Sequence, residues 1–174
     1  MYWGDKAIVM AKEALKIFIH SLPMGSKFNI CSFGSNHSFL FPESREYSED
    51  SLEQALEDID TYDKQSMGGT EIYSPMKAIF EQNPASNDLT RHIFLLTDGA
   101  VYDTDKLVSL IGQNSSLTDT RVHTLGIGSG ASSQLVKEAA GAGSGSYFFV
   151  EHTDKLEETV IKALQKNYIP TRTL

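Results

Sequence analysis

Two short polar stretches of the sequence carry oxygen atoms that could hold a metal ion. In residues 92–100, HIFLLTDGA, an apolar run stops at Thr97-Asp98-Gly99, so a carboxylate directly follows a strand that must be buried. In Gly68-Gly69-Thr70-Glu71, a glycine pair that lets the backbone approach closely precedes a hydroxyl at the predicted start of a helix. Hydroxyl and carboxylate oxygens are hard ligands of the kind that Mg²⁺ prefers. An Asp-Gly pair is also an ordinary turn after a strand, so Asp98 alone does not establish a site.

The elements that would position these residues follow from the apolar pattern. Residues 5–22 predict an amphipathic helix, and 27–34 and 37–41 predict two short strands. Two further helices are predicted, one at 49–61 that Ser48 begins and one at 71–80 with Pro75 in its first turn. The rest alternates, with strands at 91–97, 121–127 and 146–151 and helices at 103–113, 131–141 and 153–167. This order predicts an α/β fold with a parallel sheet covered on both faces. Asp98 would then lie at the carboxyl ends of the strands, where such sheets bind ligands.

Composition sets limits on size and partners. The 174 residues, 40% of them hydrophobic, suffice for one domain, which we place at 1–167 with 168–174 as a tail or the start of a linker. The net charge of −8 disfavours nucleic acid, whose affinity for proteins comes largely from Lys and Arg. The single cysteine, Cys31, lies in a predicted strand and indicates a reducing compartment, so the cytoplasm is favoured. Residues 1–22 resemble neither a signal peptide nor a membrane span, and we expect no membrane insertion.

Three stretches resemble, in order and spacing, the von Willebrand factor A-type (vWA) domain. They are GGTEIYSPMKAIF, HIFLLTDGAVYDTDKL and VHTLGIGSGASSQLVKEAAGAGSGSYFFV. The likeness covers practically the whole chain and, with LFPESREYSEDSLEQAL, is greatest to the branch found beside vault/inter-alpha-trypsin (VIT) domains. It implies a three-layer α/β/α, Rossmann-like fold whose mostly parallel sheet has one antiparallel edge strand. It also implies a noncatalytic protein-interaction module with a metal-ion-dependent adhesion site (MIDAS), where a carboxylate from a protein partner completes the shell of a divalent cation.

The resemblance assigns only part of that site to this chain. The family's threonine ligand falls on Thr70 and its later aspartate on Asp98, and the surrounding face would be shaped by Gly68, Gly69, Gly99 and Tyr102. The family's other three ligands come from a D-x-S-x-S loop after the first strand, and these 174 residues contain no such loop. Mg²⁺ demands near-octahedral oxygen coordination, and two protein donors would leave most positions to water. We therefore expect Mg²⁺ binding to be weak or lost.

The same resemblance implies that the central first strand of the sheet is absent, between the strands at 27–34 and 91–97. An empty slot would bury unpaired backbone groups at about 1–3 kcal/mol each. Three arrangements would relieve this: the flanking strands pair directly, a segment of another chain inserts by strand addition, or the chain is a fragment of a longer product that has the strand. The abrupt start and stop favour an N-terminally truncated domain.

The main alternative is a nucleotide-binding α/β domain that uses the loop Gly126–Gly130. This loop follows a strand and opens a helix, as a phosphate-binding loop does. Its third glycine comes one residue too early for G-x-G-x-x-G, and no acidic residue ends a second strand about 20 residues on. The glycines also suit a tight turn and close helix packing, so this alternative ranks second.

An enzyme is disfavoured because no nucleophile with an activating base can be identified. The five histidines show no metal-ligand spacing, no G-x-S-x-G elbow occurs, and Cys31 lies within a predicted strand. His92 and His123 are placed at the amino ends of strands, away from the predicted site, where a structural role is expected. The acidic stretch 43–63 lacks a D-x-D-x-D-G calcium loop and is interpreted as a solvated helix face.

Overall fold

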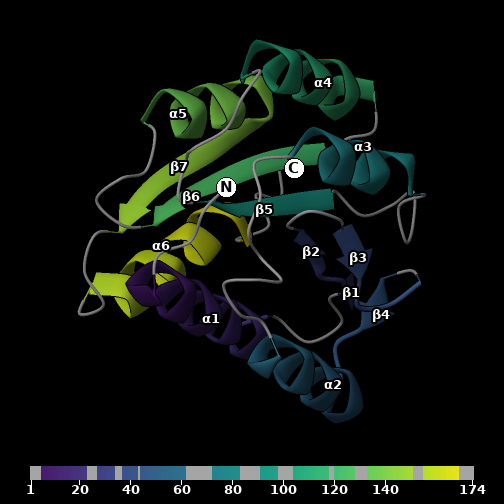
Figure 1. Ribbon diagram of the computed structural model, residues 1–174, viewed down its shortest axis with the longest axis vertical. Helices are drawn as coiled ribbons and strands as arrows, with labels where there is room; N and C mark the ends of the chain where they lie inside the picture. The colour runs from purple at the N-terminus through teal and green to yellow at the C-terminus, as the bar shows by residue number, and fades with distance from the viewer. Residues whose placement is uncertain are drawn as a thin grey trace, which may run out of the picture.

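A parallel sheet of three strands forms the middle layer of the protein (Figure 1). Its strands are β5 (Arg91–Thr97), β6 (Thr120–Ile127) and β7 (Ser144–Val150), in the order β5-β6-β7. The structure is a computed structural model that describes residues 5–22, 27–33, 37–42, 44–61, 72–82, 91–97, 104–117, 120–127, 133–150 and 155–168. Every residue of β6 except Arg121 is buried, as expected for a strand with neighbours on both edges and helices on both faces.

Helices cover both faces of this sheet. One face carries α3 (Tyr73–Glu81), α4 (Thr104–Leu117) and α5 (Ser133–Ala142), and the other carries α1 (Asp5–His20) and α6 (Leu156–Tyr168), with α2 (Glu49–Asp60) packed beside α1 (Figure 1). This arrangement confirms the three-layer α/β/α fold. No described helix is both long enough and apolar enough to cross a membrane.

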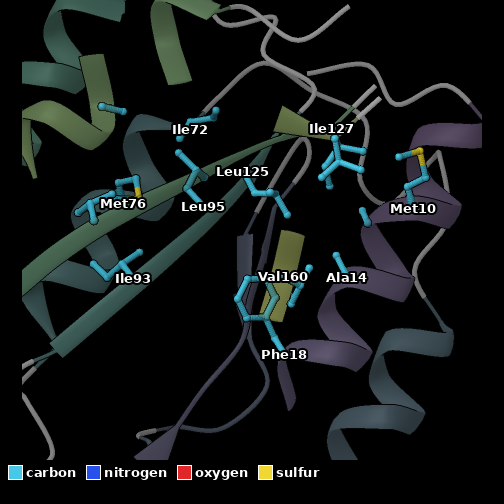
Figure 2. Close-up of a cluster of buried hydrophobic side chains, with 14 of the residues drawn as sticks. Met10, Ala14, Phe18, Ile72, Met76, Ile93, Leu95, Leu125, Ile127 and Val160 are labelled. Carbon is cyan, nitrogen blue, oxygen red and sulfur yellow. The ribbon is translucent and has the colours of Figure 1, made fainter. Parts of the chain in front are cut away.

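The buried core lies in two layers, one on each side of the sheet (Figure 2). Toward α3, the core side chains include Ile72, Met76, Ile93 and Leu95. Toward α1 and α6, the core side chains are Met10, Ala14, Phe18, Leu125, Ile127 and Val160. Phe18 reaches β5, where its ring centroid lies 4.8 Å from that of Phe94. Successive side chains of β5 and β6 therefore point to opposite faces of the sheet and contribute to both layers of the core.

The predicted start of α2 is confirmed, whereas the predicted end of α4 is not. Ser48 begins α2 as predicted: its hydroxyl accepts from the Ser51 amide at 3.3 Å, and the Ser51 hydroxyl accepts from the Ser48 amide at 2.9 Å. The predicted end of α4 at 113 is wrong, because the helix continues to Leu117. The additional turn is polar. Asparagine favours turns, but here the Asn114 side chain donates to the Leu110 carbonyl of the same helix at 2.9 Å.

The first half of the chain forms short antiparallel pairs rather than long strands. β1 (Lys27–Phe28) pairs with β4 (Arg45–Glu46), and β2 (Cys31–Phe33) pairs with β3 (His37–Phe39). The single strand predicted at 27–34 is thus interrupted at Asn29. The Asn29 carbonyl oxygen Oδ1 accepts from the amides of Ile30 and Phe41 at 2.9 and 3.0 Å, and its Nδ2 donates to the Phe41 carbonyl at 2.9 Å. The side chain therefore replaces ladder hydrogen bonds that the backbone would make.

The two strands expected to flank the absent first strand of the family, β2 and β5, do not pair with each other. β5 forms a ladder with β6, and β2 forms one with β3, but β2 and β5 belong to different sheets. The direct pairing of the flanking strands, one of the three arrangements considered from the sequence, is therefore wrong. The antiparallel strand predicted at the edge of one sheet is instead part of a separate pair.

Candidate functional site

The six residues predicted to form the site all lie outside the described residues: Gly68, Gly69, Thr70, Asp98, Gly99 and Tyr102. The structure does describe Ile72 and Thr97, the residues next to these segments in the sequence. Ile72, just before α3, is 1% exposed, and Thr97, the last residue of β5, is fully buried. Both segments are thus anchored in the protein interior within two residues of the predicted ligands.

The carboxyl ends of the sheet strands lie at one edge of the molecule. Thr97 pairs with Gly126 across β5 and β6, and Ile127 pairs with Val150 across β6 and β7. Figure 2 shows Ile127 at this end of β6, and Ile72 belongs to the same buried cluster. Asp98 follows Thr97 in the sequence and so comes directly after this end of β5.

The oxygen donors of the sequence fit a Mg²⁺ site only in part. Among the described residues, no three His, Cys, Asp or Glu side chains gather closely enough to hold a metal ion. The predicted ligands Thr70 and Asp98 carry two oxygen donors of the right chemical type, whereas octahedral coordination needs six.

The sequence comparisons decide the family. A profile of the von Willebrand factor type A domain matches residues 4–149, which is most of the chain. The chain belongs to the vWA family. It is 36% identical over 168 residues to a von Willebrand factor A domain-containing protein of Dictyostelium discoideum, covering 97% of this chain and 18% of that protein. It is 38% identical over 159 residues to human von Willebrand factor A domain-containing protein 5B1, covering 91% of this chain and 13% of that protein. The chain thus spans less than a fifth of the length of either relative.

Solved structures confirm the vWA fold. A von Willebrand factor type A protein from Catenulispora acidiphila superposes with a TM-score of 0.74 at 22% identity, over 87% of this chain and 36% of that chain. Proximal thread matrix protein 1 from the mussel byssus, in a form with a zinc-occupied MIDAS motif, gives a TM-score of 0.70 at 16% identity, over 92% of this chain and 43% of that chain. Both likenesses, at less than 25% identity, show that the fold is shared.

The loop of the nucleotide-binding alternative is only partly described. Gly126 lies within β6, where it pairs with Thr97 on one side and Phe149 on the other, and 128–130 lie outside the described residues. Gly126 is thus part of a strand at the centre of the sheet, and its pairing with both neighbouring strands gives it a structural role.

The Cys31 thiol shows no sign of activation, because burial raises its pKa to about 11.

The opposite, amino end of the sheet holds features that the sequence did not reveal. Arg91 donates from Nη1 to the carbonyls of Ile79 and Gln82, both at 2.9 Å, and from Nε to the Thr120 hydroxyl at 3.0 Å. It thereby joins the end of α3 to β5 and β6. Burial lowers the pKa of this guanidinium. Its only signal in the sequence is a charge at the first position of a buried strand.

A cavity of about 330 Å³ also lies at this end, between the last turns of α4 and α5 and the start of β6, and is lined by Gly112, Ser115, Ser116, Thr120, Arg121, Ala142 and Ser144. The Ser115 hydroxyl is buried without a hydrogen-bond partner. This cavity lies at the amino end of β6, whereas Thr97, which precedes the predicted ligand Asp98 in the sequence, is at the carboxyl end of β5.

Proposed function

We propose that residues 1–167 act as a noncatalytic vWA module that binds a protein partner at the carboxyl edge of its sheet. Thr70 and Asp98 would form a partial MIDAS on this face, shaped by Gly68, Gly69, Gly99 and Tyr102. The observation that supports the proposal is the burial of Ile72 and Thr97, which lie within two positions of the predicted ligands Thr70 and Asp98 in the sequence. The VIT neighbourhood indicated by the sequence stays a prediction.

Metal binding by this chain would be weak or lost. A divalent cation at a MIDAS supplies a positive charge with an open position for a carboxylate of the partner. In this chain, Thr70 and Asp98 could hold such an ion through one hydroxyl and one carboxylate, and water would have to supply the rest. The binding face would therefore depend mainly on its own loops and on whatever the partner contributes.

The experiment that tests this proposal compares melting temperatures with and without 10 mM Mg²⁺. If the dissociation constant is about 10 mM or weaker, binding adds at most about 0.4 kcal/mol, which is a shift of roughly 1–2 °C for a chain of this size. A second protein carries an added N-terminal strand ending in D-x-S-x-S. If its dissociation constant is about 0.1 mM, the gain is about 2.7 kcal/mol and the shift roughly 5–11 °C.

Two variants locate the effect. Asp98→Asn and Thr70→Ala should abolish the large Mg²⁺-dependent shift of the strand-restored protein, and Asp105→Asn, at an exposed position in the first turn of α4, should leave it unchanged. A large shift in the original chain would contradict weak binding. A shift in the restored protein that survives Asp98→Asn would contradict the assignment of the site.

A further inference from the structure

The ladder between β6 and β7 is interrupted at His123. Val122 pairs with Ser144 and Thr124 pairs with Tyr147, so two residues of β7, Gly145 and Ser146, stand opposite the single residue His123. This two-against-one arrangement is a β-bulge, a feature that redirects the backbone or a side chain. The residues opposite His123 therefore make contacts other than the regular ladder.

The local sequence Gly143-Ser144-Gly145-Ser146 permits this bulge. Ser144 has a φ of 55°, a left-handed conformation that non-glycine residues seldom adopt. A Cβ at Gly145 would lie 1.9 Å from the Val122 carbonyl oxygen and 2.7 Å from His123 Nδ1. Only a glycine therefore lets β7 approach the His123 ring so closely.

The bulge brings a backbone amide to the imidazole and extends a hydrogen-bond chain across the sheet. The Ser146 N–H donates to His123 Nδ1 at 3.0 Å. On the other side of the ring, His123 Nε2 lies 3.0 Å from His92 Nδ1 on β5. The two rings are nearly parallel, at 14°, with centroids 5.3 Å apart. One chain of contacts thus joins β7, β6 and β5. His123 was predicted at the amino end of a strand, whereas it lies in the middle of β6.

The positions of the protons in this chain follow from the Ser146 amide. An amide N–H can only donate, so His123 Nδ1 must be bare, and the neutral ring then carries its proton on Nε2. His123 Nε2 therefore donates, and His92 Nδ1 must accept. If His92 gains a proton on Nδ1, or His123 gains one on Nδ1, two donors face each other. Exchanging the tautomer of His123 only moves this conflict to the Ser146 amide.

We propose that His92, His123 and the Ser146 amide form an acid-sensitive clasp that holds β5, β6 and β7 together while both imidazoles are neutral and opens when either takes up a proton at a shared nitrogen. The clasp is separate from the predicted metal ligands and does not rest on the proposed function. Opening it would loosen the sheet whose carboxyl edge carries the vWA site.

The surroundings of His123 oppose a positive charge. Burial is the largest cause that lowers its pKa, followed by the charges of His92 and Arg121, and together they bring it from 6.5 to about 4. Toward α1, the ring meets Phe94 at 4.9 Å between centroids. On the elements packed against β6, the other charged side chains that the structure describes are Lys12, Glu13, Lys16, His20, Arg91, Asp105, Lys106, Lys137 and Glu138. Six of these are exposed, Lys16 pairs with Asp60 at 2.9 Å, Lys12 donates to the Asp60 carbonyl, and Arg91 donates to carbonyls of α3.

The sign of the pH dependence follows directly. The unfolded chain takes up a proton on His123 near pH 6.5, whereas the folded chain resists until about pH 4. Stability from the clasp is therefore complete above pH 6.5 and is lost as the pH falls toward 4. The unfolding equilibrium constant should rise by up to tenfold per pH unit over this window, and roughly 300-fold in all, from this group alone.

The test measures the pH dependence of unfolding for the full chain and two variants. His123→Gln can still accept from the Ser146 amide and donate to His92, but it cannot take up a proton in this window. We expect the unfolding equilibrium constant of this variant to rise less steeply with acid, by the tenfold per pH unit that one proton contributes. His20→Gln, at an exposed position in the last turn of α1, is the matched control and should keep the full dependence.

A second measurement needs no variant. Long-range ¹H–¹⁵N NMR spectra should show His123 with a bare Nδ1 and a protonated Nε2 from pH 8 to about pH 5. Below that pH, the hydrogen-exchange protection factor of the Ser146 amide, which corrects for the slower intrinsic exchange in acid, should fall before global unfolding. A protonated Nδ1 at neutral pH would overturn the proposal. Identical acid dependence in the wild type, His123→Gln and His20→Gln would also overturn it.

Discussion

The two halves of this vWA domain hold their strands by different means. In the second half, strands of seven and eight residues form parallel ladders, regular between β5 and β6 and broken by one bulge between β6 and β7, and helices connect successive strands. In the first half, strands of two or three residues form isolated antiparallel pairs. There, side chains supply much of the order, through Asn29 and through the ring contacts of Phe28 with Phe41 and Tyr47. The comparison indicates that burial stabilises the strands of the parallel sheet, whereas a few specific polar and aromatic contacts order the short strands β1 to β4.

The largest expected difference comes from removing one aromatic ring that packs on the parallel sheet and one that lies in the short antiparallel strands. Phe18→Ala should lower the free energy of unfolding by about 3–5 kcal/mol, because the buried ring fills the space between α1 and Phe94 on β5. Phe28→Ala, at a half-buried position, should lower it by about 1–2 kcal/mol, since less apolar surface is lost. Urea unfolding measures both. Equal losses would contradict the view that burial stabilises the parallel sheet more than it stabilises the short strands.

A substitution at the bulge sharpens the comparison within the parallel sheet. Gly145→Ala should destabilise by about 3 kcal/mol, because the added Cβ would meet the Val122 carbonyl on the neighbouring strand. Gly141→Ala in α5 is the matched control: its Cβ would meet nothing within 4 Å. At an exposed helical position, alanine should stabilise by about 0.5–1 kcal/mol. Thermal unfolding of both variants would test this, and a neutral Gly145→Ala would contradict the close approach of β7 to β6.

A smaller effect is expected at Asn29 in the first half. Asn29→Ala removes one donor and one acceptor that serve three backbone groups, and should lower the free energy of unfolding by about 1–3 kcal/mol. Asn29→Asp keeps the acceptor for the amides of Ile30 and Phe41 but loses the donor to the Phe41 carbonyl. It should therefore destabilise less than alanine. If chemical denaturation ranks aspartate below alanine, the side chain does not replace the ladder as described.

The same contrast explains what the sequence could predict. Strands β5 and β6 were predicted to within one residue of their ends, because periodicity and burial agree there. The break at Asn29 and the β1–β4 pair were missed, since they depend on one side chain that bonds to a residue 12 positions away. The clasp was missed for a similar reason: Gly143-Ser144-Gly145 signals a turn, and only the register places Ser146 against His123. The metal ligands Thr70 and Asp98 came from the family resemblance and stay a prediction.

The most direct test of the account is whether the 174-residue chain holds a divalent cation at Thr70 and Asp98. Mn²⁺ can be added to ¹⁵N-labelled protein, because it broadens the NMR signals of nearby nuclei. We expect the NMR signals of Ile72 and Thr97 to broaden only weakly and without saturation up to millimolar Mn²⁺, and Asp98→Asn to leave this broadening unchanged. Saturable broadening at micromolar Mn²⁺ around these two residues, abolished by Asp98→Asn, would show a complete site and contradict the account.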